Sequence, residues 1–465
     1  MLPRALWLYC LAAVHTLAQS TVSSLSLSSA SNGAIVLSGT NSFTDDNILP
    51  TGSRVTYVSY GSQRTISSTA SNPAATSASN ATASGTASTT SSPRGTTQAV
   101  ALLAGSVGLI TQSIINGTVT LGANTTAASA SASASSTTST VLNTQPCNNY
   151  PELCERKYSN ITEVCAHNSP FVKAGNAASN QNLPVLNQLN DGIRMLQGQT
   201  HFENNTLFYC HTSCSLLNAG TMEAYLATVA SWVRTHPYDV VTILIGNADF
   251  IGVGNYTAPI QASGLGPYLY EPPYIPMKLN DWPTLSEMIL TQKRVVLFMD
   301  YNADQTTVPY IFDEFSQLWE TPFSPTNVSF PCNTQRPPGL DRNQSLERMY
   351  MANHNLNAEI NFLGASLLLP NTAQINQTNA VSGFSSLGLM ANTCTTDWNR
   401  PPNFLLVDFY DVGNGSVFEV AAQHNNVTYN RPCCGVATSA APSPFTTPSL
   451  LAASMAALAA LAALL

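Results

Sequence analysis

Charged residues are scarce in this chain. Asp, Glu, Lys and Arg make up 9% of its 465 residues, whereas soluble domains usually carry about 25%. The formal net charge of −8 argues against the basic patches that bind nucleic acid, so no nucleic acid is expected as a partner. The length allows one large domain with additional segments at its ends.

Several common catalytic motifs are also missing. The sequence has no Gly-x-Ser-x-Gly elbow of a serine hydrolase and no His-Glu-x-x-His helix of a zinc protease. Neither of the glycine-rich phosphate loops, G-x-G-x-x-G and G-x-x-x-x-G-K-[ST], is present. Their absence disfavours an open, doubly wound nucleotide-binding sheet, which is the alternative α/β architecture.

The N-terminus has the pattern of a secretory signal peptide. Arg4 precedes an apolar run at 5–14, and the site Thr16-Leu17-Ala18 follows. This order of a basic residue, a short apolar stretch and a cleavage site predicts that residues 1–18 are removed on secretion.

The C-terminal residues 435–465 have the layout of a GPI-attachment signal. Small residues at 439–441 are followed by a Pro/Thr spacer and an apolar tail at 450–465. A transmembrane helix is the alternative, but this tail would span only about 24 Å as a helix, less than the roughly 30 Å hydrocarbon core. We therefore expect a secreted, GPI-anchored protein that meets the membrane through its lipid anchor at the cell surface.

The cysteine content fits an oxidising compartment. Ten cysteines less Cys10, which leaves with the signal peptide, give nine. Most are expected to form disulfides, with one thiol left over and the pairing open. Zinc is an alternative for Cys210-His211-x-x-Cys214, although no second pair at zinc-finger spacing accompanies it. Frequent N-x-S/T sequons indicate a glycosylated surface; they begin at Asn80, Asn116, Asn124, Asn160, Asn204, Asn255, Asn327, Asn343, Asn376, Asn414 and Asn426.

Two regions lie between these terminal signals. Residues 19–146 are rich in Ser, Thr, Ala and Gly and are predicted to form a largely disordered, low-complexity stalk. From 147 to 434, helical and strand patterns alternate, which predicts an α/β fold, a TIM-like (β/α) barrel, with active residues at the C-terminal ends of its strands. The predicted helices are 183–189, 221–234, 285–290 and 417–423, and the predicted strands are 193–196, 206–210, 240–245, 294–299 and 404–407.

Two histidines follow short apolar strands. His167 lies in Ala-His-Asn-Ser, and His211 lies in Cys-His-Thr about forty residues later. A side chain that titrates near pH ~6.5 can both accept and return a proton, so such a pair suits acid–base cleavage of a phosphodiester. The alternative is a pair of structural histidines beneath a barrel rim.

Five short motifs lie at 166–169, 192–194, 211, 236–241 and 407–410. Together they resemble the catalytic X-domain of phosphatidylinositol-specific phospholipase C. The likeness is greater to the secreted fungal phospholipase C-like phosphodiesterases. The resemblance implies a distorted TIM barrel that cleaves phosphoinositol-type lipid or glycolipid headgroups, with His167 and His211 as its catalytic pair. Asn168 would orient a phosphate oxygen or hold its loop.

The sequence departs from this family where the family carries charge. The calcium-dependent branch has two acidic ligands, and the metal-free branch has an arginine, at positions that here align with Gln197 and Gln199. Neutral amides are poor sole ligands for calcium, so we expect no metal and no other cofactor. The glutamines would instead support the site or donate hydrogen bonds to the phosphate. His201, further along the same strand face, is either a substitute cation or a loop histidine.

Two aspartates follow later strands of the predicted barrel. Asp408 is expected to orient a catalytic histidine and Asp300 to bind a substrate hydroxyl, with capping or salt bridging as the alternative for both. The sequence thus predicts a metal-independent phosphoric diester hydrolase. The alternative is a non-catalytic cell-surface binding protein built on the same barrel, and a metal-dependent glycerophosphodiesterase ranks third.

Overall fold

The computed structural model describes residues 144–362 and 365–435, together with Tyr57, residues 62–66 and four short strands nearer the N-terminus. The predicted signal peptide and all but the first residue of the predicted anchor signal lie outside the described residues. Among the described residues, no helix combines the length and apolarity needed to cross a bilayer. The short strands pair as two antiparallel hairpins, one of β1 (Leu25–Ser29) with β2 (Ile35–Gly39) and one of β4 (Ile114–Ile115) with β5 (Thr118–Val119).

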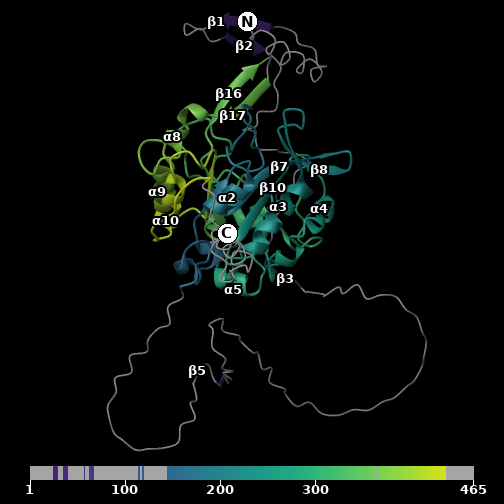
Figure 1. The fold of residues 1–465 in the computed structure, drawn as a ribbon, viewed down its shortest axis with the longest axis vertical. Coiled ribbons are helices and arrows are strands. Elements are labelled where there is room, and N and C mark those ends of the chain that lie inside the picture. The colour runs from purple at the N-terminus through teal and green to yellow at the C-terminus, as the bar shows by residue number, and fades with distance from the viewer. Residues whose placement is uncertain are drawn as a thin grey trace, which may run out of the picture. The chain divides into compact units, whose positions relative to one another are not determined.

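Eight parallel strands form the central sheet (Figure 1). Around the sheet their order is β13, β12, β10, β7, β6, β18, β15 and β14. Adjacent strands in this order are hydrogen-bonded to each other. Of the eight strands, the one that comes first in the sequence, β6, pairs with the one that comes last, β18. The strands are β6 (Glu163–Ala166), β7 (Met195–Glu203), β10 (Val241–Asn247), β12 (Val295–Met299), β13 (Ile311–Asp313), β14 (Leu318–Glu320), β15 (Met349–Asn353) and β18 (Phe404–Val407).

The pairing of β6 with β18 curls the sheet into a barrel. Ala166 is in register with Val407 on one side and with Leu196 of β7 on the other. The two edges of the sheet, β13 and β14, are joined by the one-turn helix α6 (Glu314–Gln317) and share no ladder among the described strand pairings. We call this gap between β13 and β14 the seam. The predicted TIM-like barrel is therefore confirmed, as a barrel with one unpaired seam.

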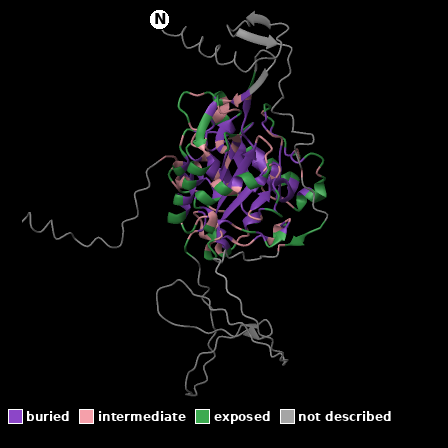
Figure 2. Cartoon of the chain, turned by 90° about the vertical axis from the view of Figure 1, so that its right-hand side faces the viewer, coloured by how far each residue is buried: buried purple, intermediate pink, exposed green. Residues whose placement is uncertain are grey.

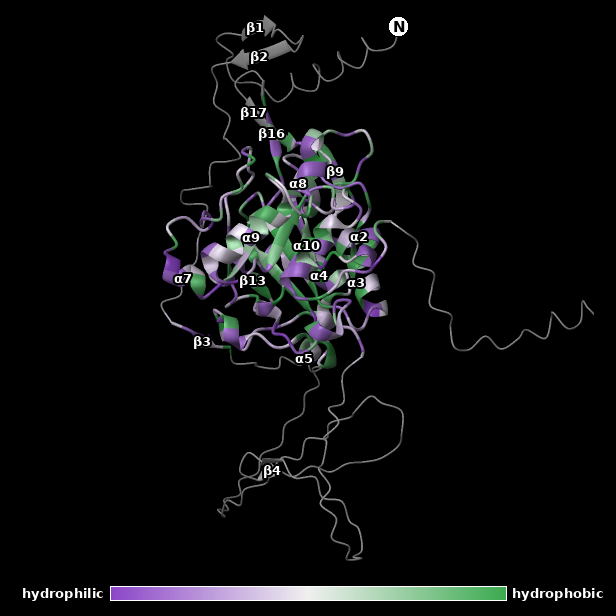
Figure 3. Ribbon diagram, turned by 90° about the vertical axis from the view of Figure 1, so that its left-hand side faces the viewer, coloured by the Kyte–Doolittle hydropathy of each residue, from purple (hydrophilic) through white to green (hydrophobic). Residues whose placement is uncertain are grey.

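Side chains alternate between the two faces of the barrel wall. Every residue of β10 and β12 is buried, as expected for parallel strands covered on both faces. Val296 and Phe298 of β12 belong to the inner apolar cluster, whereas Val295 and Leu297 belong to the outer cluster beneath the helices. Figure 2 shows the buried strands at the centre with exposed residues on the surrounding helices, and Figure 3 shows the same centre as hydrophobic.

The helices form from the amphipathic patterns of the sequence. In α3 (Met222–Thr235) the Thr221 side chain accepts a hydrogen bond from Ala224 N and caps the first turn. Predicted and observed helices agree within a few residues. The longer helices are α2 (Val185–Asp191), α3, α4 (Thr257–Ala262), α5 (Leu285–Leu290), α9 (Leu387–Trp398) and α10 (Ser416–His424), and the shorter ones are α7 (Arg342–Leu346) and α8 (Ile375–Thr378).

The strand that carries His211 is not one of the eight barrel strands. β8 (Thr206–His211) runs antiparallel to the extended end of β7, with Thr200 opposite Tyr209, and continues into β9 (Leu217–Thr221). The sequence pattern located this strand correctly but did not specify its direction. A short apolar run has the same pattern in a hairpin as in a parallel sheet, so pairing decides between them.

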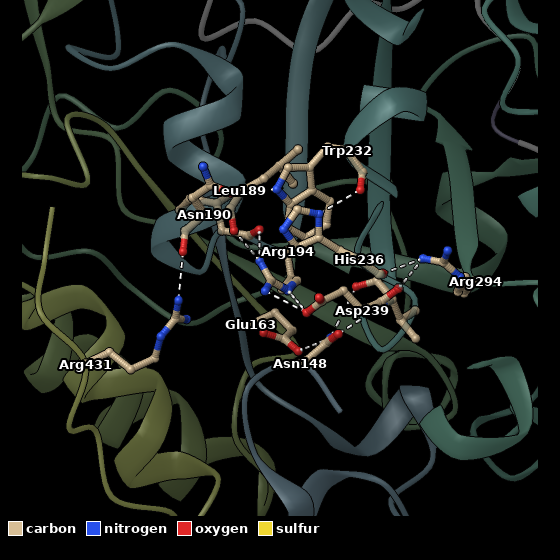
Figure 4. Close-up of polar contacts among 12 residues, drawn as sticks. Asn148, Glu163, Leu189, Asn190, Arg194, Trp232, His236, Asp239, Arg294 and Arg431 are labelled. Carbon is tan, nitrogen blue, oxygen red and sulfur yellow. Dashed lines mark hydrogen bonds and ion pairs between the residues drawn. The ribbon is translucent and has the colours of Figure 1, made fainter. Parts of the chain in front are cut away.

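A polar network closes the end of the barrel where the strands begin (Figure 4). Arg194 donates to Asp239 Oδ1 from Nη2 at 2.7 Å and to two backbone carbonyls, and its guanidinium lies 5.2 Å from the Trp232 ring centroid. Asn148 donates to Glu163 Oε1 at 2.7 Å. These contacts tie the start of β6 and β7 to the loop before β10. Arg194 therefore serves the fold.

Part of the range predicted as a stalk packs on the barrel. The Tyr57 ring lies 5.3 Å from the Phe315 ring of α6 and 5.9 Å from the Tyr301 ring. Strand β3 (Arg64–Thr65) pairs with β11 (Tyr274–Ile275), and Gln63 donates to Pro276 O at 3.0 Å. Residues 57 and 62–66 therefore contact the seam helix and the outer wall, within the range 19–146 that was predicted to be a stalk.

The described cysteines form four disulfides and leave Cys165 as a buried thiol. Cys210 and Cys214 are bonded to each other, so the alternative of a zinc site at this Cys-His-x-x-Cys motif is wrong. The bond closes the turn after His211 and restrains that histidine's backbone. The remaining pairs are Cys147–Cys154, Cys332–Cys394 and Cys433–Cys434.

Candidate active site

The inner face of the barrel changes from apolar to polar at the C-terminal ends of the strands. Residues two apart on a strand share a face, so the inward Cys165 is followed by His167, and the inward Leu406 is followed by Asp408. The same step leads from Met195 to Gln197 on β7. We call this end the barrel mouth. The hairpin of β16 (Asn357–Phe362) and β17 (Ala365–Pro370) follows β15 at this end (Figure 1).

His167 is held by a carboxylate at the barrel mouth. Its Nδ1 lies 2.7 Å from Asp408 Oδ1, and Asn180 Nδ2 donates to the same oxygen at 2.9 Å. Gln181 Nε2 donates to His167 O at 2.8 Å and to Val407 O at 3.0 Å, which fastens the backbone of both strand ends. Because the carboxylate accepts from Nδ1, the Nε2 atom of His167 is left for chemistry.

His211 lies close enough to His167 for their charges to interact. Burial, and to a smaller extent the charge of the neighbouring His167, lower the pKa of His211 to about 4. The His211 ring contacts the Phe171 ring edge to face, with centroids 5.3 Å apart. Both histidines are nearly buried, with exposed fractions of 8% and 9%. His211 is therefore a neutral imidazole in the free protein at pH 7.

Gln197 and Gln199 tie down the residues that follow the two histidines. Gln197 Oε1 accepts from Asn168 N at 2.7 Å, and Gln199 Oε1 accepts from Thr212 N at 3.1 Å. Asn168 and Thr212 both have positive φ, of 47° and 58°, a conformation that is uncommon outside glycine. One strand thus holds both histidine loops through the side chains of neighbouring inward positions.

Gly198 allows these two loops to approach β7. A Cβ at this position would lie 2.9 Å from Pro170, which belongs to the His167 loop, and 2.9 Å from Tyr209 on the strand that carries His211. Such contacts are shorter than van der Waals packing allows. In the Gln-Gly-Gln sequence, the two glutamines hydrogen-bond to the loops that follow the histidines, and the glycine lets those segments pack closely against β7.

The glutamine positions do not fit calcium. Calcium takes six to eight oxygen ligands, usually with several carboxylates, whereas both glutamine oxygens are already acceptors for backbone N–H groups. Within the described part of the chain, no cluster of three or more His, Cys, Asp or Glu side chains has the arrangement of a metal site. With their oxygens engaged in this way, the two glutamines do not supply the donor set of a calcium site.

Asp300 belongs to a buried ion-pair cluster on another side of the mouth. Its Oδ1 accepts from Asn247 N at 2.8 Å, and its Oδ2 lies 3.6 Å from Arg336. Arg336 also donates to both carboxylate oxygens of Glu320 at 2.9 and 3.0 Å and to Tyr301 Oη at 2.7 Å. Burial raises the pKa of Asp300 to about 6. These contacts favour the salt-bridging alternative for Asp300 over a hydroxyl-binding role.

The remaining predicted histidine has a different partner. His201 Nδ1 lies 3.1 Å from Asp249 Oδ1, and both side chains are partly buried. No hydrogen bond or ion pair described for His201 joins it to the two-histidine cluster. The suggestion that His201 substitutes for the missing cation therefore has no support from its contacts.

Sequence patterns missed three polar residues that contact His167. Asn180 and Gln181 lie in the loop after Phe171, and Asn355 lies just beyond β15 with its Nδ2 3.5 Å from His167 Nε2. Loop residues have no periodicity that predicts their direction. Asn355 had a usable signal, because period-two alternation from the inward Met351 leads through Asn353 to position 355.

Residues 153–425 match the family model PI-PLC X 1, and this range is more than half of the chain. The chain therefore belongs to the PI-PLC X domain family. The sequence resemblance is confirmed at the level of the family, while the roles of individual site residues stay predictions.

This chain is also similar to two fungal proteins in sequence and to a solved bacterial structure. An "Uncharacterized secreted protein" of Arthroderma benhamiae is 58% identical over 74% of this chain and 77% of its own length. "PI-PLC X domain-containing protein 1" of the same fungus is 42% identical over 58% of this chain and 86% of its own. The phosphatidylinositol-specific phospholipase C from Listeria monocytogenes aligns over 58% of this chain and 94% of its own, with 11% identity and a TM-score of 0.39.

Proposed function

We propose that this protein is a phosphoric diester hydrolase that cleaves phosphoinositol-type lipid or glycolipid headgroups by two-histidine acid–base catalysis, without a metal ion. The observation that carries the proposal is the 2.7 Å contact of His167 Nδ1 with Asp408, beside the second imidazole of His211. This arrangement supplies one imidazole oriented by a carboxylate and a second within electrostatic reach. Membership of the PI-PLC X domain family supports the choice of headgroup.

In the proposed reaction, His167 Nε2 takes the proton from a hydroxyl of the headgroup as the oxygen of that hydroxyl attacks phosphorus. The bond between phosphorus and the lipid oxygen breaks, and His211 gives its proton to that oxygen. The products are a cyclic phosphodiester of the headgroup and a lipid with a free hydroxyl. Asp408 stabilises the imidazolium that forms at His167.

Neutral donors replace the family's charged groups in this proposal. The side-chain oxygens of Gln197 and Gln199 accept backbone N–H groups, so each amide presents its NH₂ group to the phosphate. A bound phosphodiester anion also favours the protonated form of His211, because an opposite charge nearby stabilises the imidazolium. Binding of substrate would thus favour protonation of His211, the general acid of the proposed reaction.

The proposal is tested on the secreted, full-length protein with phosphatidylinositol as substrate. We expect cyclic inositol phosphate to be released at the same rate with and without EDTA, because no step uses a metal. The product is followed by phosphorus NMR. A requirement for added divalent metal would instead favour the glycerophosphodiesterase alternative and contradict the metal-independent mechanism.

When the same assay is run at a series of pH values, the pKa of His211 predicts where kcat/KM falls on the acid side. The active state holds one proton between the two imidazoles, and this state is lost when both rings are protonated. Since the pKa of His211 is about 4, kcat/KM is expected to fall as the pH drops through about 4. An unperturbed histidine would place that limb near ~6.5. An acid limb at 6 or above would contradict the assignment of His211.

The absence of charge at Gln197 and Gln199 also favours a second candidate, a binding protein without turnover. Loss of one electrostatic contact to a transition state typically costs about 10²–10³ in rate. If the purified protein binds inositol phosphate in calorimetry but releases no product from phosphatidylinositol at any pH, the binding function replaces the catalytic one.

We also propose that the mature protein is a glycosylated, GPI-anchored protein of the cell surface. Every sequon asparagine in the described residues is exposed: Asn160, Asn204, Asn255, Asn327, Asn343, Asn376, Asn414 and Asn426. The similarity to a secreted fungal protein supports the same compartment. We expect peptide N-glycosidase to lower the apparent mass, and a GPI-cleaving phospholipase to release the protein from membranes. Retention of the protein on membranes after that treatment would contradict the anchor.

A further inference from the structure

Asn355 lies against the nitrogen that the proposed mechanism uses as a base. Its Nδ2 is 3.5 Å from His167 Nε2, on the side of the ring opposite Asp408. Asn355 is 1% exposed, and its Oδ1 is buried with no hydrogen-bond partner. A buried amide with only one long contact is costly to a fold, so this side chain points to a ligand.

The backbone around Asn355 is fixed by its neighbours. His354 N donates to Leu406 O at 2.9 Å, and Asn357 Nδ2 donates to Asn355 O at 2.9 Å. The His354 side chain faces the opposite way, where its Nε2 lies 2.9 Å from Thr378 O. Alternation along this stretch therefore directs Asn355 toward the barrel mouth while His354 anchors the segment on the outside.

The distance between the two nitrogens matches the spacing of two atoms that share one oxygen as a hydrogen-bond partner. A separation of 3.5 Å is too long for a strong hydrogen bond, but an oxygen can lie about 2.8 Å from both atoms. A hydroxyl at that point would donate its proton to His167 Nε2 and accept a hydrogen bond from Asn355 Nδ2. The two side chains thus form a cradle for a hydroxyl group.

We propose that Asn355 is a catalytic residue that holds the attacking hydroxyl of the substrate and stabilises its oxygen as the proton leaves. This inference rests on the proposed function. As the proton moves to His167, the oxygen gains negative charge, and hydrogen bonds to a charged oxygen are about twice as strong as neutral ones. The contact therefore favours the transition state over the bound substrate, and its loss lowers kcat more than it changes KM.

The unpartnered Oδ1 extends the inference to the ligand. A buried carbonyl oxygen without a donor is satisfied best by a ligand O–H group. Asn168 Oδ1, in the loop that follows His167, is buried and unpartnered as well. The site thus offers acceptors for hydroxyls beside the one that reacts, which selects a polyol headgroup over a headgroup with a single hydroxyl.

The test measures phosphatidylinositol cleavage by the full-length protein and three variants. Asn355→Ala is expected to lower kcat by about 10²-fold, with KM within about threefold. Asn355→Asp keeps the shape but places a carboxylate beside His167, which favours the protonated ring, so the basic limb of kcat/KM moves to higher pH. A residue that only supported the fold would lower the thermal stability of Asn355→Ala and leave kcat of the folded variant unchanged. The control is Asn392→Asp on the exposed face of α9, which is expected to match the unmodified protein.

The possible outcomes separate this inference from the proposed function. If the unmodified protein cleaves the substrate and Asn355→Ala retains kcat within threefold, Asn355 is not catalytic while the hydrolase proposal stands. If the unmodified protein shows no turnover, the proposed function fails and this inference fails with it. If Asn355→Ala does not fold by circular dichroism, Asn355→Asp decides: an unmoved basic limb with full activity overturns the inference.

Discussion

Replacing Asp408 with asparagine is expected to lower kcat by about 10⁴-fold, as loss of the orienting carboxylate does in Ser-His-Asp hydrolases. The reason is the 2.7 Å contact between Asp408 Oδ1 and His167 Nδ1. A carboxylate accepts the Nδ1 proton and leaves Nε2 unprotonated, whereas an asparagine NH₂ group would donate to Nδ1 and move the ring proton to Nε2. The base of the proposed reaction would then be blocked. Steady-state rates of phosphatidylinositol cleavage measure the effect.

The control for this change is Asp411→Asn, three residues further along the chain. Asp411 accepts from Asn182 Nδ2 at 3.1 and 3.2 Å at an exposed site, so the same loss of charge there should leave kcat within about twofold. His167→Ala and His211→Ala should each reduce turnover as strongly as Asp408→Asn. The double histidine variant should be little worse than either, because the two residues act in one step. Activity of Asp408→Asn near that of the unmodified protein would show that the carboxylate does not orient the base.

A protein that begins at residue 144 is expected to be less stable than one that begins at residue 50, by about 2–4 kcal/mol. The truncation removes Tyr57, whose ring packs on Phe315 and Tyr301, and strand β3 with its pairing to β11. Two aromatic contacts at about 0.5–1.5 kcal/mol each and several hydrogen bonds at about 0.5–1.5 kcal/mol each account for the range. Thermal unfolding followed by circular dichroism should record a fall in Tm of about 5–10 °C.

The seam explains why this contact matters. Phe315 belongs to the one-turn helix that joins the edge strands β13 and β14, and Tyr301 Oη accepts from the buried Arg336 at 2.7 Å. Without Tyr57 these rings and the Arg336 cluster become more accessible to water at the gap in the barrel. Tyr57→Ala in the longer protein should reproduce part of the loss, while Ser62→Ala at an exposed position should not. Equal Tm values for the two starting points would mean that the N-terminal residues add nothing to the barrel.

The sequence predicted most of the secondary structure for reasons that are local. The apolar spacing at 221–234 predicted α3, and the unbroken apolar run at 240–245 predicted β10; both formed within two residues of those bounds. Burial of one helix face or of both strand faces requires such patterns wherever the element lies in the fold. The order of elements then indicated a barrel, because alternating strands and helices pack as parallel β/α units.

The candidate site was predictable only in part. The strand ends identified His167 and Asp408 separately, and the resemblance to the family joined them with His211. Alternation along β15 could have indicated Asn355, but nothing local indicated Asn180 or the tethering role of the two glutamines. Those contacts join segments that lie apart in the chain, so they depend on how the strand ends converge.

The helices and strands, their order and the absence of charge at positions 197 and 199 all follow from local residue patterns. Three features depend on the folded chain: β8 turns back on β7, β13 and β14 do not pair with each other, and Tyr57 reaches the seam helix from a Ser/Thr-rich segment. The folded chain also brings the side-chain oxygens of the two glutamines into hydrogen bonds with the backbone of the loops after the two histidines. Periodicity records which face of an element is buried, whereas hydrogen-bond partners and register are set by distant segments that meet only in the folded chain.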